Sequence, residues 1–291
     1  MKPAPFDYHT PTSVLEAAGL LRDFGDDAKL IAGGQSLVPM LALRLARFEH
    51  LVDIGRIDEL RGVERRNGSL VVRAGTPDVT IEHDAEVAAA VPLLAKVTPL
   101  IGHFQIRNRG TVGGSLAHAD PAAEYPAVAT ALDADFEVVS TRGERTVPAA
   151  DFFTGLWSTA LEPDEVLTAI HFPVWDGRCG FGVAEFARRH GDFALAGAVA
   201  GIELGPTDTV ARCVISLFGL GVTPVRARTA EATLTGQPAR ALSADEVGRL
   251  AVGDAQDPPE DLHAPPAYRL RVGAAMAASA WSRALTEAQN D

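Results

Sequence analysis

The sequence has few cysteines and no long apolar run, and each shortage excludes a class of protein. Its two cysteines, Cys179 and Cys213, cannot form a disulfide framework. They also cannot hold an iron–sulfur cluster alone, since such a cluster usually takes four thiolates. No apolar run reaches the roughly 20 residues that a membrane-spanning helix needs, and the N-terminal residues lack the apolar region of a secretory signal. We therefore expect a cytoplasmic protein without a membrane span or a metal site of its own.

Positive charge is also in short supply. The chain has 26 Lys and Arg residues against 38 Asp and Glu residues, which gives a net charge of −12. This balance opposes binding to nucleic acid or to an anionic membrane surface. Hydrophobic residues make up 47% of the 291 positions, which is ample for a buried core and allows more than one domain.

Hydrophobic periodicity predicts a mixture of helices and strands. Apolar residues at positions 14, 17, 18, 21 and 24 follow a helical spacing after a candidate N-cap, Ser13 or Thr12, and Gly25 ends the pattern. Residues 125–140 read as a helix followed by a strand. The other predicted strands lie at 29–32, 49–55, 68–78, 167–174 and 213–221, and the other predicted helices at 37–47, 81–102 with a break at Pro92, 227–235, 243–252 and 266–289.

Two glycine pairs are the most informative feature. Gly33 and Gly34 lie in AGGQSLVPMLALR, between a predicted strand and a predicted helix. Gly113 and Gly114 lie in TVGGSLAHADP, within residues 104–121, which show no regular periodicity. A glycine pair lets the backbone bend sharply and approach a ligand closely, and successive amide groups favour an anion. Two such loops suit a ligand with two phosphates, although each pair could instead form only a tight turn.

The common nucleotide-binding motifs are missing. The chain has neither the lysine-containing phosphate loop nor the Rossmann glycine motif, so a diphosphate held by backbone amides points to an FAD-binding fold of another type. Downstream, Asp120 and Glu124 are candidate acceptors for ribityl or adenosine hydroxyls, if residues 118–124 are a loop and the next helix begins near Pro126. His118 could pair with Asp120 as a metal ligand, but no further ligand cluster supports that.

Taken together, AGGQSLVPMLALR and IRNRGTVGGSLAHADPAAEYPA resemble the FAD-binding medium subunit of the molybdenum hydroxylases, the family of the xanthine dehydrogenase and carbon monoxide dehydrogenase flavoproteins. PTSVLEAAGLL, DFFTGLWSTALEPDEVLTAIHFP and GDFALAGAVAGIEL resemble the same family in the same order. The resemblance implies an α+β fold with a two-part FAD-binding domain of the vanillyl-alcohol-oxidase/PCMH type. A smaller α+β C-terminal domain, an antiparallel sheet plus helices, would follow. Glycines cluster at residues 175–182, so we place the three parts at 1–57, 58–176 and 177–291.

The resemblance also implies a set of cofactor-binding residues. For the diphosphate and the ribityl chain these are Ala32, Gly33, Gly34, Gln35, Ser36, Thr111, Gly113, Gly114 and Ser115, with His118, Asp120 and Glu124 beside them. Leu37, Ile101 and Leu161 are candidate walls for the flavin ring, although plain core packing explains each equally well. Phe193 stands where related carbon monoxide dehydrogenase subunits carry tyrosine, so it keeps the stacking surface and loses the hydroxyl. Arg107 and Arg109 flank the second loop and could balance the charge of the diphosphate, but we expect them to be solvated or paired with acidic residues. No acid–base catalytic residue is expected.

The implied role is electron transfer. In the family, a large subunit holds the molybdopterin cofactor and a small subunit holds two [2Fe-2S] clusters, and we expect a dimer of such heterotrimers. Electrons would pass from the clusters to FAD on this chain and then to an external acceptor. The carbon monoxide enzymes have histidine and asparagine where this chain has Gln35 and Ser115, which favours an aldehyde or an N-heterocycle as the substrate. Two alternatives stay open: a stand-alone FAD oxidoreductase of the vanillyl-alcohol-oxidase superfamily, and a scaffold protein that has lost the cofactor.

Overall fold

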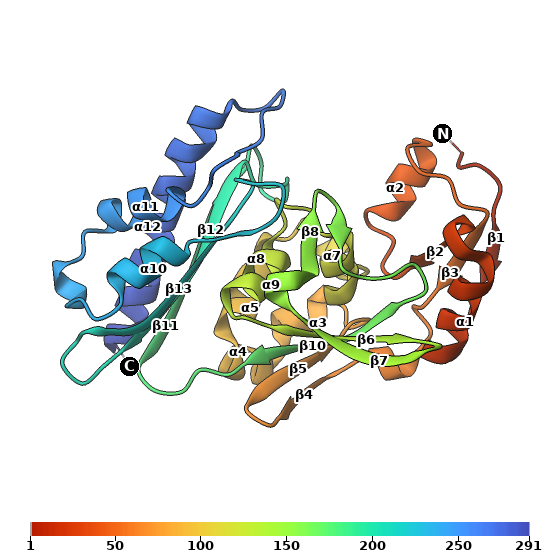
Figure 1. Cartoon of the computed structure of the whole chain (residues 1–291), viewed down its shortest axis with the longest axis horizontal. Coiled ribbons are helices and arrows are strands. Elements are labelled where there is room, and N and C mark those ends of the chain that lie inside the picture. Colours follow the sequence, from red (N-terminus) through yellow and green to blue (C-terminus); the bar gives the residue numbers. More distant parts are fainter. Residues whose placement is uncertain (1, 291) are drawn as a thin grey trace.

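The computed structural model describes residues 2–290, which form three main sheets arranged along the long axis of the molecule (Figure 1). The first sheet, at the N-terminal end, is parallel with strand order β1-β3-β2. Its elements are β1 (Asp7–His9), α1 (Val14–Phe24), β2 (Ala28–Ile31), α2 (Leu37–Ala42) and β3 (His50–Asp53). Short 3-10 turns span Gly25–Asp27, Asp58–Leu60, Thr98–Leu100 and Ala239–Ala241.

The structure confirms the first predicted helix and both of its predicted ends. The Ser13 side chain accepts a hydrogen bond from the amide of Glu16, and Gly25 closes the helix with φ 56°, as expected for an N-cap serine and a glycine after the last turn. The buried positions of α1 are Val14, Ala17, Ala18 and Leu21, which are four of the apolar positions that predicted the helix. They pack in a core that the first sheet shares with Val166 of the middle sheet.

The second predicted helix is shorter than expected. The sequence pattern predicted residues 37–47, but α2 ends at Ala42. Arg44 adopts a left-handed conformation with φ 58°, and the amide of Leu45 turns back to donate to the carbonyl of Met40 at 2.9 Å. This closure ends the helix by satisfying its last carbonyls, and the apolar residues beyond it leave the helical path.

The middle sheet is antiparallel with strand order β4-β5-β10-β6-β7. Its strands are β4 (Val63–Arg66), β5 (Ser69–Arg73), β6 (Asp135–Ser140), β7 (Gly143–Pro148) and β10 (Val166–Pro173), and β8 (Phe153–Gly155) pairs with β9 (Ser158–Thr159) in a separate hairpin. The associated helices are α3 (Asp78–His83), α4 (Ala85–Ala90), α5 (Pro92–Val97), α6 (Phe104–Arg107), α7 (Val112–His118), α8 (Glu124–Ala131) and α9 (Ala149–Phe152). The predicted break at Pro92 is confirmed, because Pro92 begins α5.

Two expectations for residues 104–126 are wrong. The segment without periodicity contains α6 and α7, and Gly113 and Gly114 lie in the first turn of α7. The following helix begins at Glu124 rather than near Pro126. Pro126 is tolerated because it is the third residue of α8, where a backbone N–H has no partner within the helix.

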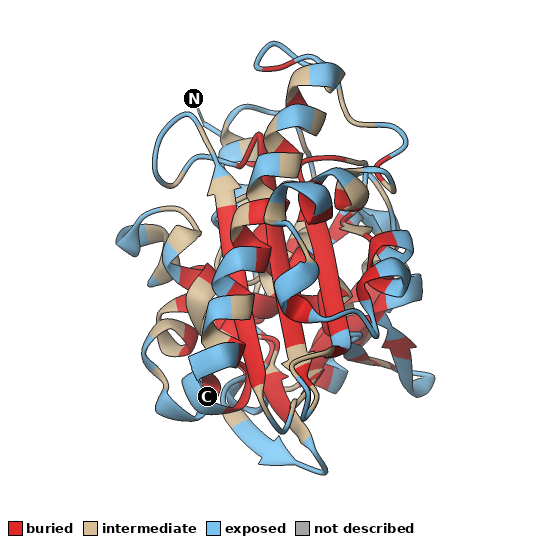
Figure 2. Ribbon diagram, turned by 90° about the vertical axis from the view of Figure 1, so that its left-hand side faces the viewer, coloured by how far each residue is buried: buried red, intermediate tan, exposed pale blue. Residues whose placement is uncertain are grey.

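The C-terminal sheet is antiparallel and is buried on both faces. It consists of β11 (Cys179–Phe186), β12 (Ala196–Leu204), β13 (Val210–Phe218) and β14 (Val225–Arg226). Figure 2 shows its buried strands behind the helices that cover one face, namely α10 (Arg228–Leu234), α11 (Ala244–Val252) and α12 (Pro266–Asn290). These three helices confirm the sequence prediction. The opposite face packs on α5 and α8, which separate this sheet from the middle one.

Glycines in β11 explain how closely α12 lies on the sheet. A Cβ atom at Gly180 would lie 2.0 Å from the carbonyl oxygen of Ala284, and one at Gly182 would lie 2.0 Å from that of Ala280. Phe181 alternates with these glycines and points into the core shared with the middle sheet. Gly180 and Gly182 of the glycine-rich stretch therefore serve helix–sheet packing. No helix among residues 2–290 is long and apolar enough to cross a membrane.

Candidate functional site

The two glycine loops lie against each other. Gly33 follows β2, at the carboxyl end of the parallel sheet, where ligands commonly bind in such sheets. A Cβ atom at Gly33 would lie 2.1 Å from the carbonyl oxygen of Arg109 and 2.8 Å from the Cα atom of Gly110. Residues that are distant in the sequence thus form one continuous surface, and only glycine fits at position 33.

The first loop carries backbone donors without partners. Gly34 has φ 73°, a conformation that favours glycine. The amide groups of Gly34, Gln35 and Ser36 have no acceptor among the residues that the structure describes. The Gln35 side chain turns back and donates to the carbonyl of Gly33 at 3.0 Å. Because these amides precede the first turn of α2, they can receive an anion together with the positive end of the helix dipole.

The second loop differs from the expectation that both loops offer free amides. The amide of Gly113 donates to the carbonyl of Ala74 at 2.8 Å, that of Gly114 to Oγ1 of Thr111 at 3.1 Å, and that of Ser115 to the carbonyl of Thr111 at 3.0 Å. A Cβ atom at Gly113 would lie 2.4 Å from the Cβ of Ala74. Gly113 is therefore required by packing. What the second loop offers a ligand is the Ser115 hydroxyl, which has no partner in the described chain.

The chain segments that contain the two loops carry no acidic side chain of their own. Residues 28–48 and 87–119, which contain the two loops, include no Asp or Glu. Arg107 is not available to a ligand, because Nε donates to Glu82 at 2.7 Å and Nη1 donates to the carbonyl of Ile101 at 3.1 Å. The expectation of an ion-paired Arg107 is confirmed. Arg109 is exposed and forms no ion pair with any described residue.

His118 and Asp120 share a partner that sequence analysis missed. Nε1 of Trp157 donates to Asp120 Oδ2 at 3.1 Å, and the Trp157 ring lies nearly parallel to the His118 ring with 6.4 Å between centroids. Burial lowers the pKa of His118, with the Lys29 charge adding to the effect and Asp120 opposing it, so a neutral imidazole is favoured. Within residues 2–290 no cluster of three or more His, Cys, Asp or Glu side chains could hold a metal ion. Trp157 is 58% exposed, so this face offers an aromatic surface.

Glu124 is paired with a second carboxyl group. Glu124 begins α8 and is buried, and its side chain lies near that of Glu185 in β11, close enough for the two groups to affect each other's pKa. Burial, reinforced by the charge of Glu185, raises the pKa of Glu124 to about 8, and burial raises the pKa of Glu185 to about 7. Two neighbouring carboxyl groups favour sharing one proton. A protonated Glu124 can donate a hydrogen bond as well as accept one.

The remaining candidates lie in two environments. Ile101 and Leu161 are half-buried against the core of the middle sheet, and Leu37 is half-buried at the start of α2. Phe193 is 60% exposed in the connection between β11 and β12. In that connection, a Cβ atom at Gly191 would lie 2.8 Å from the carbonyl oxygen of Gly102. The loop that carries Phe193 is thus held against the segment that carries Ile101.

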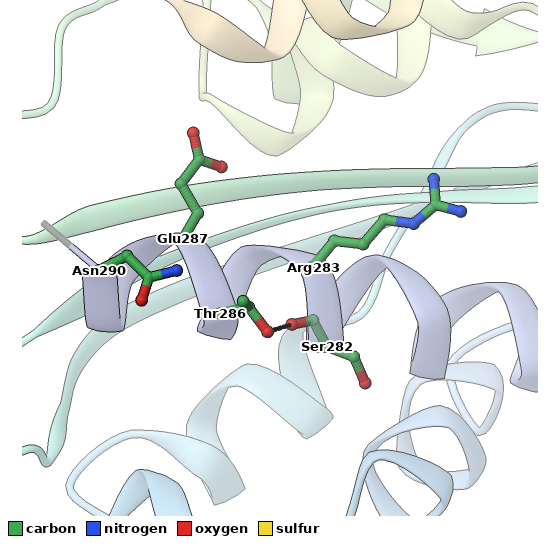
Figure 3. A pocket seen from close by; sticks show the side chains of 5 residues that line it. All are labelled: Ser282, Arg283, Thr286, Glu287 and Asn290. Atoms are coloured by element: carbon green, nitrogen blue, oxygen red, sulfur yellow. Dashed lines mark hydrogen bonds between the residues drawn. The ribbon is translucent and has the colours of Figure 1, made fainter.

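A separate pocket lies on the C-terminal helix. It has a volume of about 530 Å³ and is lined by Ser282, Arg283, Thr286, Glu287 and Asn290 (Figure 3). Glu287 projects from α12 toward the rest of the molecule, where its Oε2 accepts from Nζ of Lys96 and from the amide of Phe181. None of the candidate cofactor residues lines this pocket. At this pocket, Glu287 therefore links α12 to β11 and to α5.

Comparison with known proteins agrees with this geometry. Residues 4–175 match the family described as "FAD binding domain in molybdopterin dehydrogenase", and residues 182–284 match the "CO dehydrogenase flavoprotein C-terminal domain". The chain is 38% identical over 287 residues to the carbon monoxide dehydrogenase medium chain of Hydrogenophaga pseudoflava. The alignment covers 97% of this chain and 99% of that protein.

Two solved structures have the same fold. One is carbon monoxide dehydrogenase from Oligotropha carboxidovorans, with a TM-score of 0.95 and 34% identity over 99% of this chain and 100% of that one. The other is quinoline 2-oxidoreductase from Pseudomonas putida 86, with a TM-score of 0.92 and 35% identity over 99% of each chain. The predicted α+β fold is confirmed. The chain belongs to the FAD-binding medium subunits of the molybdenum hydroxylase family.

Proposed function

We propose that this chain takes electrons from the [2Fe-2S] clusters of a small partner subunit and delivers them, through its FAD, to an external acceptor. Bound FAD supplies the electron-carrying chemistry, and the protein binds, orients and shields it. The observation that carries the proposal is the first glycine loop, whose unpartnered amides at Gly34, Gln35 and Ser36 lie beside the packed Gly33–Arg109 contact.

The residues present fit a flavin dinucleotide. The diphosphate needs donors and little side-chain bulk, which the first loop supplies, and the segments 28–48 and 87–119 that contain the loops add no acidic side chain. Hydroxyl groups of the ribityl chain need small polar partners, which Ser115 and Asp120 provide. The flavin ring needs apolar and aromatic surface, for which exposed Phe193 and half-buried Leu37 are candidates.

The cofactor-binding set proposed here is unchanged from the sequence prediction, although the roles of its members differ. Gly33 and Gly113 act by permitting close packing of the backbone, and Thr111 acts by capping α7. The set is Ala32, Gly33, Gly34, Gln35, Ser36, Leu37, Ile101, Thr111, Gly113, Gly114, Ser115, His118, Asp120, Glu124, Leu161 and Phe193.

The proposed assembly is a dimer of heterotrimers in the cytoplasm, with a large subunit holding the molybdopterin cofactor and a small subunit holding the clusters. Its support is the family to which the chain belongs, in which relatives are named as medium chains. Within the chain, we propose parts at residues 1–57, 58–176 and 177–291. A core centred on α1 and the first sheet supports the first of these parts, although Leu60 and Val166 of the second part also contribute to it.

The proposed substrate of the complex is an aldehyde or an N-heterocycle rather than carbon monoxide. Gln35 and Ser115 stand where the carbon monoxide enzymes carry histidine and asparagine. In addition, one of the similar proteins is named as an oxidoreductase of quinoline, which is an N-heterocycle. Carbon monoxide enzymes are equally similar to this chain, so activity must decide. Purified complex should reduce a dye with aldehydes or N-heterocycles and remain inactive with carbon monoxide.

The alternative of a stand-alone oxidoreductase predicts a different result. An electron-transfer subunit needs its partners, so the isolated chain with bound FAD should not be reduced by any substrate of the complex. The intact complex should show substrate-dependent bleaching of its oxidised flavin absorbance. Bleaching of the isolated chain by the same substrates would favour the stand-alone enzyme.

A further inference from the structure

One exposed surface of the chain is both aliphatic and basic. Residues 37–48, which comprise α2 and the turn after it, are called here the α2 tip. Val38, Leu43 and Leu45 are 51%, 55% and 73% exposed, and Leu41 is the one buried residue of α2. Figure 1 shows α2 projecting at the N-terminal end of the molecule, far from the C-terminal sheet. Large aliphatic side chains grouped on an exposed surface commonly mark a protein interface.

The two arginines of the α2 tip form no ion pair within the part of the chain that the structure describes. Arg44 and Arg47 are exposed, and neither forms an ion pair with a described residue. Arg44 uses its Nε to donate to the carbonyl of Lys2 at 3.3 Å. The nearest acidic residues along the chain are Asp27 and Glu49, outside the tip. In a protein of net charge −12, such a surface fits a partner surface that is acidic around an apolar centre.

The shape of the α2 tip is fixed by the backbone. Arg44 is left-handed with φ 58°, and the amide of Leu45 donates to the carbonyl of Met40 at 2.9 Å. This closed turn holds Leu43 and Leu45 on the outside, so a partner can bind them with little loss of conformational entropy.

The α2 tip is also close to the proposed cofactor site. Its helix begins one residue after Ser36, at the end of the first glycine loop, and its six residues span only about 9 Å at 1.5 Å per residue. A partner bound on the tip therefore lies close to the loop that we propose binds the FAD diphosphate. This matters for a subunit whose role is to receive electrons across an interface.

We propose that the α2 tip is the docking surface for the iron–sulfur subunit, and this assignment rests on the proposed function. A [2Fe-2S] centre with two ferric ions, two sulfides and four thiolates carries a net negative charge. The proposal requires acidic residues on the partner's surface over that centre, which would complement Arg44 and Arg47. The aliphatic residues of the tip then form the buried centre of the interface, and the arginines lie at its rim.

The test uses the whole complex, purified through a tag on this chain. The variants are Leu45→Glu, which places a charge at the apolar centre, and the double change R44E/R47E, which reverses the rim charge. Leu15→Glu is the matched control, since Leu15 is a leucine of similar exposure (63%) on α1. The measurements are FAD per chain, iron per chain and the subunits retained. The Kd for the separated [2Fe-2S] subunit is then measured at low and high salt.

Both tip variants should keep FAD while losing iron and the small subunit, with Kd raised about tenfold to a hundredfold, and Leu15→Glu should match the wild type. R44E/R47E should also weaken the salt dependence of association. The assignment is overturned if both variants retain the small subunit, if they lose the large subunit alone, or if the tip instead mediates self-association of this chain. A wild-type chain that carries FAD but purifies without any iron–sulfur subunit would overturn the proposed function itself.

Discussion

Gly33 and Arg109 are in backbone contact: the position of a Cβ atom at Gly33 is 2.1 Å from the Arg109 carbonyl oxygen. The neighbouring Gly110 is equally constrained, because a Cβ there would lie 2.3 Å from Oδ2 of buried Asp78. The first contact joins the end of the parallel N-terminal sheet to the segment before α7, and the second joins that segment to α3. The two glycine loops are therefore one structural unit, and changes at the contact should alter both folding and cofactor binding.

Gly33→Ala is expected to separate the two loops. The added methyl group cannot avoid the Arg109 carbonyl without a backbone shift, so the free energy of unfolding should fall by about 1–3 kcal/mol. FAD retention should fall with it, measured as the ratio of flavin to protein after gel filtration. Gly19→Ala is the control, because no heavy atom lies within 4 Å of a Cβ there and the position is inside α1. The control should stabilise the protein slightly, and a fully flavin-loaded G33A protein of normal stability would contradict this reading of the contact.

Two variants at Thr111 distinguish its role as a helix cap from a hydrogen bond to the ligand. Its Oγ1 accepts from the amide of Gly114, so Thr111→Val, which keeps the shape and removes the hydroxyl, should cost about 1 kcal/mol of stability. Thr111→Ser keeps the hydroxyl and should retain most of that stability. Thermal unfolding with and without added FAD measures both effects. Equal melting temperatures for the valine and serine variants would exclude the capping role.

The Glu124–Glu185 pair should make stability depend on pH. The pKa of Glu124 is raised from 4.5 to about 8 in the folded chain, so between these values the native state holds a proton that the unfolded state has lost. The stabilisation is present below pH 4.5 and is lost as the pH rises toward 8, by up to about 1.4 kcal/mol per pH unit for each retained proton. Glu124→Gln should flatten this slope, as followed by urea unfolding at a series of pH values.

Asp78 provides an internal comparison for that experiment. Burial raises its pKa to about 7, and its Oδ1 has no partner, so it titrates in the same direction as Glu124. Asp78→Asn should therefore raise stability at pH 8 and leave it nearly unchanged at pH 5.

For the Glu124 experiment, parallel pH profiles of the wild type and Glu124→Gln would exclude a shared proton between Glu124 and Glu185.

Glu287 is expected to hold the C-terminal helix to the rest of the chain. Its carboxylate accepts from Lys96 on α5 and from the Phe181 amide on β11. Glu287→Ala leaves both donors without this acceptor and should cost about 1–3 kcal/mol. Glu260→Ala, at an exposed glutamate without a side-chain partner in the described chain, should be neutral. Hydrogen exchange of α12 would locate the change, and unaltered protection there would argue against the clamp.

Sequence patterns predicted the elements whose periodicity matches their burial. The apolar stripe and both ends of α1 follow from Ser13, Gly25 and the spacing between them, and α10 to α12 follow in the same way. The pattern failed for α7, since its first turn is stabilised by distant residues: Ala74 and Thr76 accept hydrogen bonds from its amides. Local propensity cannot register such partners.

The candidate site could be predicted as two glycine loops but not as a surface. The motif revealed Gly33 and Gly113, whereas their reason for being glycine is packing against Arg109 and Ala74. Trp157 and Glu185 were missed, because each reaches the site from a strand or hairpin far along the chain. No local pattern marks either residue, so only the folded arrangement brings them to Asp120 and Glu124.

The most direct test of the account is a crystal structure of the purified yellow chain with its FAD bound. The diphosphate oxygens should lie within hydrogen-bond distance of the amides at residues 34–36, about 2.7–3.2 Å, with the Gly33–Arg109 contact intact beside them. A diphosphate bound elsewhere, with these amides facing solvent, would contradict the central claim that the first glycine loop binds the cofactor.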